Sequence, residues 1–170
     1  GGDGYEQGAE MGLISAYRLR LRRQRLLWRA FRRRRELSSV ANRMETCPAQ
    51  PILLFSILRN ERIRLPYFLD YYRKLGIDHF VLVDNGSDDG SREYLAAEPD
   101  VSLWSTGASY KRSRFGMDWL MHLLRRHGRE KWCLTVDVDE FLVFPFCETR
   151  PLRALTDWLD SSGTRTFSAM

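Results

Sequence analysis

The amino-acid sequence predicts an α/β fold, in which a mostly parallel sheet is covered by helices on both faces and preceded by a basic N-terminal helix. From residue 52 onward, apolar runs of strand length alternate with helical patterns, an order typical of parallel strands joined by right-handed crossovers. In front of this region, ten arginines fall between Arg18 and Arg35 with no acidic residue among them. That segment is therefore expected to form an element of its own.

The composition predicts a globular domain, because 44% of the 170 residues are hydrophobic and 12% are aromatic. Removing the ten arginines from the 27 basic residues leaves 17 basic against 22 acidic residues, so the basic character is local. No run of about 18 apolar residues exists, and we expect no membrane span. The three cysteines form no Cys-x-x-Cys pair, which favours a reducing, cytoplasmic location over a disulfide framework or a zinc site.

The chain divides into four regions. Residues 1–10 are rich in Gly and polar groups and are expected to be disordered. Residues 11–37 are expected to form a basic amphipathic helix, with an apolar stripe made of Ile14, Tyr17, Leu21, Trp28 and Phe31. Residues 38–51, with two prolines and several small polar residues, predict a linker. Residues 52–170 form the compact domain. Because residue 1 is Gly and the last residues resemble a strand with nothing after it, we expect a fragment that is incomplete at its C-terminal side.

Strands in the compact domain are expected wherever a continuous apolar run of strand length occurs, which is typical of strands covered on both faces. These runs lie at residues 52–58, 79–83, 101–104 and 131–136, with a short extra strand at 141–144 and a last one at 164–170. Helices are expected at residues 65–75, 91–97, 114–127 and 151–159. Pro66 suits a first helical turn, Gly76 a helix end and Ser91 a helix N-cap.

Polar residues follow three of these strands. In an open parallel sheet, ligands bind beyond the carboxyl ends of the strands, and polar side chains there are not explained by the core. The three clusters are Asn60-Glu61, residues 84–89 and residues 137–140. Loops at one edge of one sheet would bring all three together, so the sequence predicts a binding site at that edge.

The sharpest cluster is Asp137-Val138-Asp139, because residues two apart in an extended chain point the same way. Two carboxylates on one side suit Mg²⁺ or Mn²⁺, which would keep other positions for water and a diphosphate. An isolated Asp-x-Asp is more often a surface turn. Here the apolar strand before it and Phe141-Leu142 after it favour the metal site.

The loop at residues 84–90 is crowded with Asp, Asn, Gly and Ser. A calcium loop is excluded, because its third, sixth and twelfth positions hold Gly86, Asp89 and Leu95. Turn formation and helix capping explain part of the pattern. Asp84 stands at the strand tip, where a carboxylate can accept hydrogen bonds from a nucleobase or ribose, and spacing alone does not decide between the two roles.

Arg114, with Lys111 and Arg112, lies at the entry to a helix, where basic side chains and free N–H groups favour a phosphate. Solvated surface charge is the alternative. The histidines form no metal-binding pair at helix or strand spacing.

Four stretches together resemble the bacterial family 2-like glycosyltransferases of the GT-A fold. They are Phe55-Ser56-Ile57-Leu58-Arg59-Asn60-Glu61, Leu65-Pro66-Tyr67-Phe68-Leu69, Val83-Asp84-Asn85-Gly86-Ser87-Asp88-Asp89-Gly90-Ser91 and Val136-Asp137-Val138-Asp139-Glu140-Phe141-Leu142. The resemblance implies a Rossmann-like sheet and a nucleotide-diphospho-sugar donor, such as a UDP- or GDP-sugar. It also implies that Asp84 holds the base or ribose, that Asp88 or Asp89 lies in the same donor loop, and that Asn60 and Glu61 lie near the nucleoside.

The resemblance further implies that Asp137 and Asp139 bind Mn²⁺ or Mg²⁺ and the diphosphate, with Glu140 beside them. The implied reaction is an inverting, metal-dependent transfer of sugar to an unidentified acceptor, in cell-surface polysaccharide or glycoconjugate synthesis. In that family the catalytic base lies well beyond the metal motif, so we expect it beyond Met170 and name no catalytic residue. The alternative is a non-catalytic or degenerate nucleotide-sugar-binding module.

For the arginine-rich helix, residues 11–37, three partners remain open. Arginines interleaved with Leu, Trp and Phe suit an anionic membrane surface, which would place the protein peripherally at the inner face of the membrane. Docking onto a protein partner is the second interpretation. Nucleic acid is disfavoured, because the remainder of the chain is acidic and contains no RNA-recognition motif.

Overall fold

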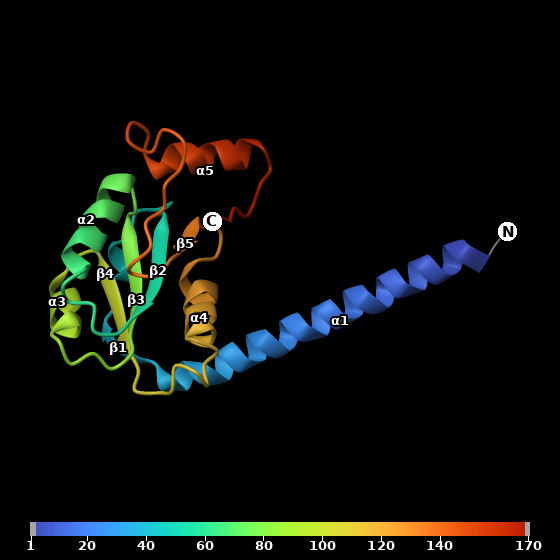
Figure 1. The fold of residues 1–170 in the computed structure, drawn as a ribbon, viewed down its shortest axis with the longest axis horizontal. Coiled ribbons are helices and arrows are strands. Elements are labelled where there is room, and N and C mark those ends of the chain that lie inside the picture. Colours follow the sequence, from blue (N-terminus) through green and yellow to red (C-terminus); the bar gives the residue numbers. More distant parts are fainter. Residues whose placement is uncertain (1–2, 169–170) are drawn as a thin grey trace.

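The protein, described here by a computed structural model, is an α/β fold built around one five-stranded sheet (Figure 1). The structure describes residues 3–168, and the side chains of residues 17–168. The strand order is β1-β4-β3-β2-β5. The strands are β1 (Ser38–Ala41), β2 (Leu53–Leu58), β3 (His79–Asp84), β4 (Val101–Ser105) and β5 (Cys133–Thr135). All neighbours pair in parallel except β1, which is antiparallel to β4. The predicted α/β class with a mostly parallel sheet is confirmed.

Helices cover both faces of the sheet, as predicted. They are α1 (Asp3–Arg33), α2 (Leu65–Leu75), α3 (Ser91–Ala97), α4 (Met117–His127) and α5 (Leu152–Ser161), with short 3₁₀ turns at Arg34–Glu36 and Met44–Thr46. Alternate residues of each strand point to opposite faces. Leu54 and Phe80 pack with α2 and α3, whereas Phe55 and Val81 pack with α4. The central strands therefore consist mainly of apolar residues, because both of their faces are buried.

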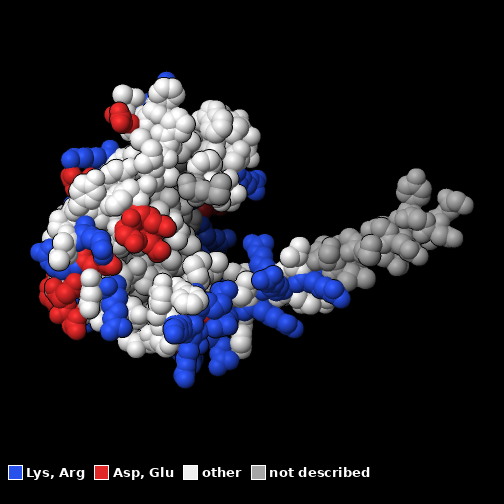
Figure 2. All heavy atoms as spheres, viewed as in Figure 1, with Lys and Arg blue, Asp and Glu red and all other residues white. Residues whose placement is uncertain are grey.

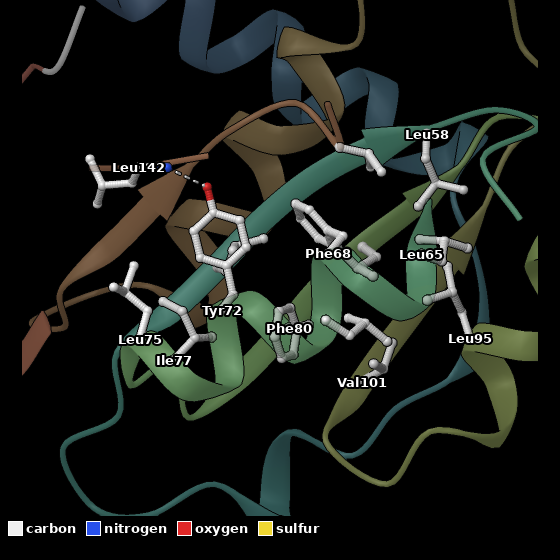
Figure 3. Close-up of a cluster of buried hydrophobic side chains, with 14 of the residues drawn as sticks. Leu58, Leu65, Phe68, Tyr72, Leu75, Ile77, Phe80, Leu95, Val101 and Leu142 are labelled. Atoms are coloured by element: carbon white, nitrogen blue, oxygen red, sulfur yellow. Dashed lines mark hydrogen bonds between the residues drawn. The ribbon is translucent and has the colours of Figure 1, made fainter. Parts of the chain in front are cut away.

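Helix α2 has the predicted bounds. Its buried face, centred on Phe68 and Tyr72, fills the space over the sheet beside Phe80 (Figure 3). Gly76 ends the helix with φ 108°, a left-handed conformation that glycine adopts without a Cβ clash. No helix within residues 3–168 combines the length and the apolar character needed to cross a membrane.

The N-terminal part of the chain differs from expectation at two places. Residues 3–10, expected to be disordered, belong to α1, because extending an existing helix costs far less than starting one. Residues 1–2, and the side chain of Ile14 in the predicted stripe, lie outside the described part. Residues 38–41, expected to belong to a linker, form β1 at the edge of the sheet. An edge strand with exposed side chains needs no apolar run, so no strand is evident from the sequence at this position.

Three other boundaries also differ. Helix α4 begins at Met117 rather than Arg114, because Arg114 and Phe115 have φ of 55° and 56°, outside the helical range. Residues 141–144 form no strand, since tyrosine hydroxyls of α2 bind the backbone N–H and C=O of Leu142 in place of a neighbouring strand. Residues 164–168 are also not a strand, and Thr164 instead donates its N–H to Leu159 O at the end of α5. Residues 169–170 lie outside the described range.

Candidate functional site

A hollow of about 300 Å³ lies beyond the carboxyl ends of β2 and β3. It is bounded by the connection from β2 to α2, the end of β3, the loop after β4 and the turn after β5. Its lining residues are Ile57, Leu58, Arg59, Glu61, Asn85, Tyr110, Asp137, Val138 and Asp139. Three of the predicted site residues, Glu61, Asp137 and Asp139, therefore line one hollow. Their role in binding stays a prediction.

The acidic turn, residues 137–140, has a different geometry from the extended one that we expected. The N–H of Glu140 donates to Asp137 O (3.0 Å), which closes a turn, and the N–H of Asp137 donates to a carboxylate oxygen of Glu140 (3.3 Å). Val138 between the two aspartates is buried, with 3% of its surface exposed. Because Val138 points into the core, its neighbours Asp137 and Asp139 point outward and border the hollow. Their shared direction results from the turn and not from the alternation of side chains along an extended strand.

Two tyrosines of α2 hold this turn in place. The hydroxyl of Tyr72 donates to Glu140 O (3.0 Å) and accepts the N–H of Leu142 (3.1 Å; Figure 3). The hydroxyl of Tyr71 donates to Leu142 O (2.7 Å). Burial raises the pKa of Tyr72 to about 12, so its hydroxyl remains protonated and able to donate near neutral pH. The position of the acidic turn is thus fixed by a helix residue, Tyr72, that lies 68 residues before Glu140 in the chain.

Negative charge accumulates at the acidic turn. Partial burial raises the pKa of Asp137, and the carboxylates of Glu140 and Asp139 raise it further. A cation beside Asp137 would relieve this repulsion. Among the described residues no group of three His, Cys, Asp or Glu side chains is arranged to hold a metal ion. A divalent cation at Asp137 and Asp139 would therefore need further oxygen ligands from water or substrate, which is how Mg²⁺ is commonly bound.

Asp84 does not line the hollow. Its carboxylate is fully buried, and one of its oxygens accepts both Nε (2.8 Å) and Nη2 (2.6 Å) of Arg92. The other accepts the N–H of Ser87 (3.1 Å). The adjacent residue, Asn85, is the one that reaches the hollow. In this structure the Asp84 carboxylate organises the loop after β3.

Asn60, Asp88 and Asp89 connect the loops that follow β2 and β3. Asn60, with φ 58°, accepts the N–H of Asp88 on its side-chain oxygen (3.0 Å). Asp89 accepts the N–H of Arg62 (2.9 Å) and the N–H of Ser91 (3.0 Å). The N-cap of α3 is Gly90 rather than the expected Ser91, which is the first helical residue and donates its N–H to Asp89. These three predicted donor-binding residues lie near the hollow without lining it.

Arg114 is engaged elsewhere. Its Nε and Nη2 donate to Asp118 Oδ1 (2.9 and 2.6 Å), and Asp118 is fully buried in the first turn of α4. A buried carboxylate requires a partner, and Arg114 supplies it. The expected phosphate-binding position of Arg114 is not among the residues that line the hollow.

Three polar lining residues were not predicted as site residues. Arg59 directly follows β2, and none of the ion pairs within the described residues involves it. Asn85 donates through Nδ2 to Thr106 O (3.2 Å) and Ala108 O (3.1 Å). The pKa of Tyr110 is raised, first by burial and then by the charge of Asp137. Arg59 and Asn85 directly follow strands, so their positions could be predicted from the tendency of ligands to bind beyond the carboxyl ends of parallel strands. Tyr110 lies in a loop, where no sequence pattern indicates a binding residue.

A larger hollow, of about 470 Å³, lies between α4, β5 and α5. Its lining is chiefly apolar, with residues such as Leu124, Leu134 and Leu155, and it includes no Asp or Glu. It therefore lacks the carboxylate oxygens that border the first hollow.

A distant, partial relative bears on the function. A rice (Oryza sativa subsp. japonica) protein named as a glycosyltransferase family 92 protein is 27% identical over 109 residues. The similarity is to a glycosyltransferase. The match covers 59% of this chain and 18% of the rice protein. No protein-family model matches the chain, and no solved structure matches it. The relative supports glycosyl transfer, and its name gives family 92 rather than family 2.

Proposed function

We propose that this chain forms the donor-binding part of a glycosyltransferase of the GT-A type, which uses a nucleotide-diphospho-sugar. The observation that supports this most is the convergence of Glu61, Asn85, Asp137 and Asp139 in one hollow beyond the carboxyl ends of parallel strands. The rice glycosyltransferase supports the same class of reaction. The motifs that resemble family 2-like enzymes include the acidic turn that borders this hollow.

The nucleoside end of the donor, from a UDP- or GDP-sugar, would be bound by Asn85 and Glu61. Asn85 uses its Nδ2 group on two backbone carbonyls, which leaves its side-chain carbonyl oxygen to accept a hydrogen bond. Glu61 is paired with Arg64 (2.6 Å) and retains acceptor capacity on its carboxylate. Asp84 then acts as a positioning residue: through Ser87 and Arg92 it fixes the loop that presents Asn85.

The diphosphate would be bound by Arg59 and by a divalent cation, Mn²⁺ or Mg²⁺, held by Asp137 and Asp139. The donor set fits a hard cation, because both side chains are carboxylates and the charge around Asp137 favours a positive partner. Such a cation supplies positive charge that stabilises a departing diphosphate. Tyr72 keeps the acidic turn in position for this binding.

The transfer itself is proposed to invert the sugar's configuration, with the hydroxyl of the acceptor attacking the anomeric carbon. None of the described residues is assigned as the base that accepts the proton. The acceptor is proposed to belong to a cell-surface polysaccharide or glycoconjugate.

Isothermal titration with UDP- and GDP-sugars, with and without Mn²⁺, tests this proposal. We expect metal-enhanced binding that weakens at least about tenfold in Asp137→Asn and in Asp139→Asn, since each substitution removes a charged ligand. Asp157→Asn is the matched control, because Asp157 is exposed on α5 away from the hollow. Undiminished metal-enhanced binding in both site variants would refute the metal assignment. If the full-length protein binds nucleotide sugars but transfers no sugar, the result would instead support a degenerate binding module.

A further inference from the structure

The apolar stripe of α1 points away from the body of the protein. Tyr17, Leu21, Trp28 and Phe31 recur at helical spacing and so fall on one side of α1. The exposed fractions of Tyr17, Trp28 and Phe31 are 62%, 61% and 52%. A stripe of this kind normally packs onto a core. Here three large aromatic side chains are left in contact with solvent.

The opposite side of α1 holds the helix on α4. Ala30 is 1% exposed, and Arg29 binds the buried Asp118 (Nε to Oδ2, 2.8 Å) and the backbone oxygen of Arg112 (2.8 Å). Glu36, just after the helix, accepts the indole N–H of Trp119 (2.9 Å). With 3.6 residues per turn, Ala30 lies on nearly the reverse side from Trp28. These contacts therefore fix the aromatic stripe in its outward orientation.

Arginines border the stripe on both sides. Arg18, Arg25 and Arg32 lie along one side and Arg20 along the other, and within residues 17–168 no carboxylate forms an ion pair with any of them. The guanidinium of Arg32 also lies over the Trp28 ring, 4.8 Å from its centroid. Figure 2 shows the Lys and Arg side chains gathered along α1 and the adjoining end of the body, whereas acidic side chains gather over the body itself. The outward face of α1 thus combines aromatic rings with uncompensated positive charge.

We propose that the outward face of α1 binds an anionic membrane surface, with the helix lying in the plane of the lipid headgroups. Aromatic side chains favour the interfacial region, where arginines can reach lipid phosphates while their apolar stems remain buried. A nucleic acid would also neutralise the arginines, but the apolar stripe between them matches the amphipathic pattern of a helix that lies in a membrane interface. This inference is independent of the proposed glycosyl transfer.

Vesicle sedimentation of the whole chain tests the proposal. Vesicles of phosphatidylcholine are compared with vesicles that contain about 30 mol % phosphatidylglycerol, whose negative surface attracts basic segments. We expect binding to the anionic vesicles, and a loss of about tenfold or more in affinity for the double variant Trp28→Ser/Phe31→Ser. The triple variant Arg18→Gln/Arg25→Gln/Arg32→Gln is expected to lose the preference for anionic lipid.

Leu19→Ser is the matched control. Leu19 is 65% exposed but lies on the side of α1 away from the stripe, so its substitution should leave vesicle binding unchanged. Circular dichroism checks that each variant keeps its helix content. Lipids brominated near the headgroup should quench fluorescence in the wild type more than in Trp28→Phe, because Trp28 is expected to enter the interface.

Equal vesicle binding by the wild type and the double variant, or equal loss in Leu19→Ser, would overturn the proposal. Tight binding of single-stranded RNA or duplex DNA without vesicle binding would also overturn it and would identify nucleic acid as the partner.

Discussion

Protonation of His127 is expected to destabilise the protein as the pH falls. The imidazole packs against Trp104, with ring centroids 5.4 Å apart, and its Nε2 atom is buried without a hydrogen-bond partner. Burial, followed by the positive charges of Arg126 and Lys131, lowers the pKa of His127 to about 4. A neutral ring is tolerated in this place, whereas a charged ring would have to be desolvated beside two cations.

The size and sign of the effect follow from the two pKa values of His127. The unfolded chain takes up a proton near pH 6.5 and the folded protein only near pH 4, so the folded state binds fewer protons between these values. The stabilisation is therefore fully present above pH 6.5 and is lost as the pH falls toward 4. A shift of this size corresponds to at most about 3 kcal/mol, and the partial solvent exposure of the ring reduces this to about 1–2 kcal/mol.

Replacing His127 by Phe tests this reasoning. Phenylalanine keeps the contact with Trp104 and has no group to protonate, so we expect the variant to keep about 1–2 kcal/mol more of its stability than the wild type between pH 7 and pH 4.5. Urea unfolding at several pH values measures the difference. His122→Phe is the comparison variant, because the pKa of His122 is also lowered by burial and nearby arginines, but its ring has no buried unpaired nitrogen. If His127→Phe loses stability with the same pH slope as the wild type, the reasoning is refuted.

Three further substitutions test the packing around the site. Gly116→Ala is expected to cost about 2–4 kcal/mol in urea unfolding, because a Cβ would collide with Ile57 and the backbone has φ 77°; near-wild-type stability would contradict this. Tyr72→Phe should cost about 1–3 kcal/mol, since the buried N–H of Leu142 loses its acceptor; thermal unfolding measures the cost, and an unchanged midpoint would argue against the contact. Asp118→Asn should release α1 from the body and speed its cleavage by limited proteolysis; cleavage at the wild-type rate would show that other contacts hold the helix.

The fold was predictable where local pattern and burial agree. Residues 53–58 and 79–84 are mainly apolar because they are covered on both faces, so strands were expected at 52–58 and 79–83 and are observed. Helix α2 has clear start and stop signals in Pro66 and Gly76. The edge strand β1 was not predictable, because it is specified by its hydrogen bonds to β4 and its side chains are largely exposed.

The site was predictable in position but only partly in detail. Strand ends indicate which edge of the sheet holds polar residues, and on this basis Asp137, Asp139 and Glu61 were expected in the lining. The direction of a side chain depends on partners that are distant in the sequence or not evident from it. Asp84 faces Arg92 rather than the hollow, and Arg114 turns to a buried carboxylate because the start of α4 is shifted. Sequence spacing does not contain this information.

The antiparallel strand β1 has a consequence for self-association. By pairing with β4, it forms hydrogen bonds with the backbone groups that would otherwise make β4 the exposed edge strand on that side of the sheet. Within the described residues the two edge strands are thus β1 and β5, which offer ladders of only four and three residues. Edge strands this short offer few unpaired backbone groups to a strand of another chain, which lowers the tendency toward amyloid-like stacking. Deleting residues 38–41 would expose the longer rim of β4, and aggregation during expression would be its first visible sign.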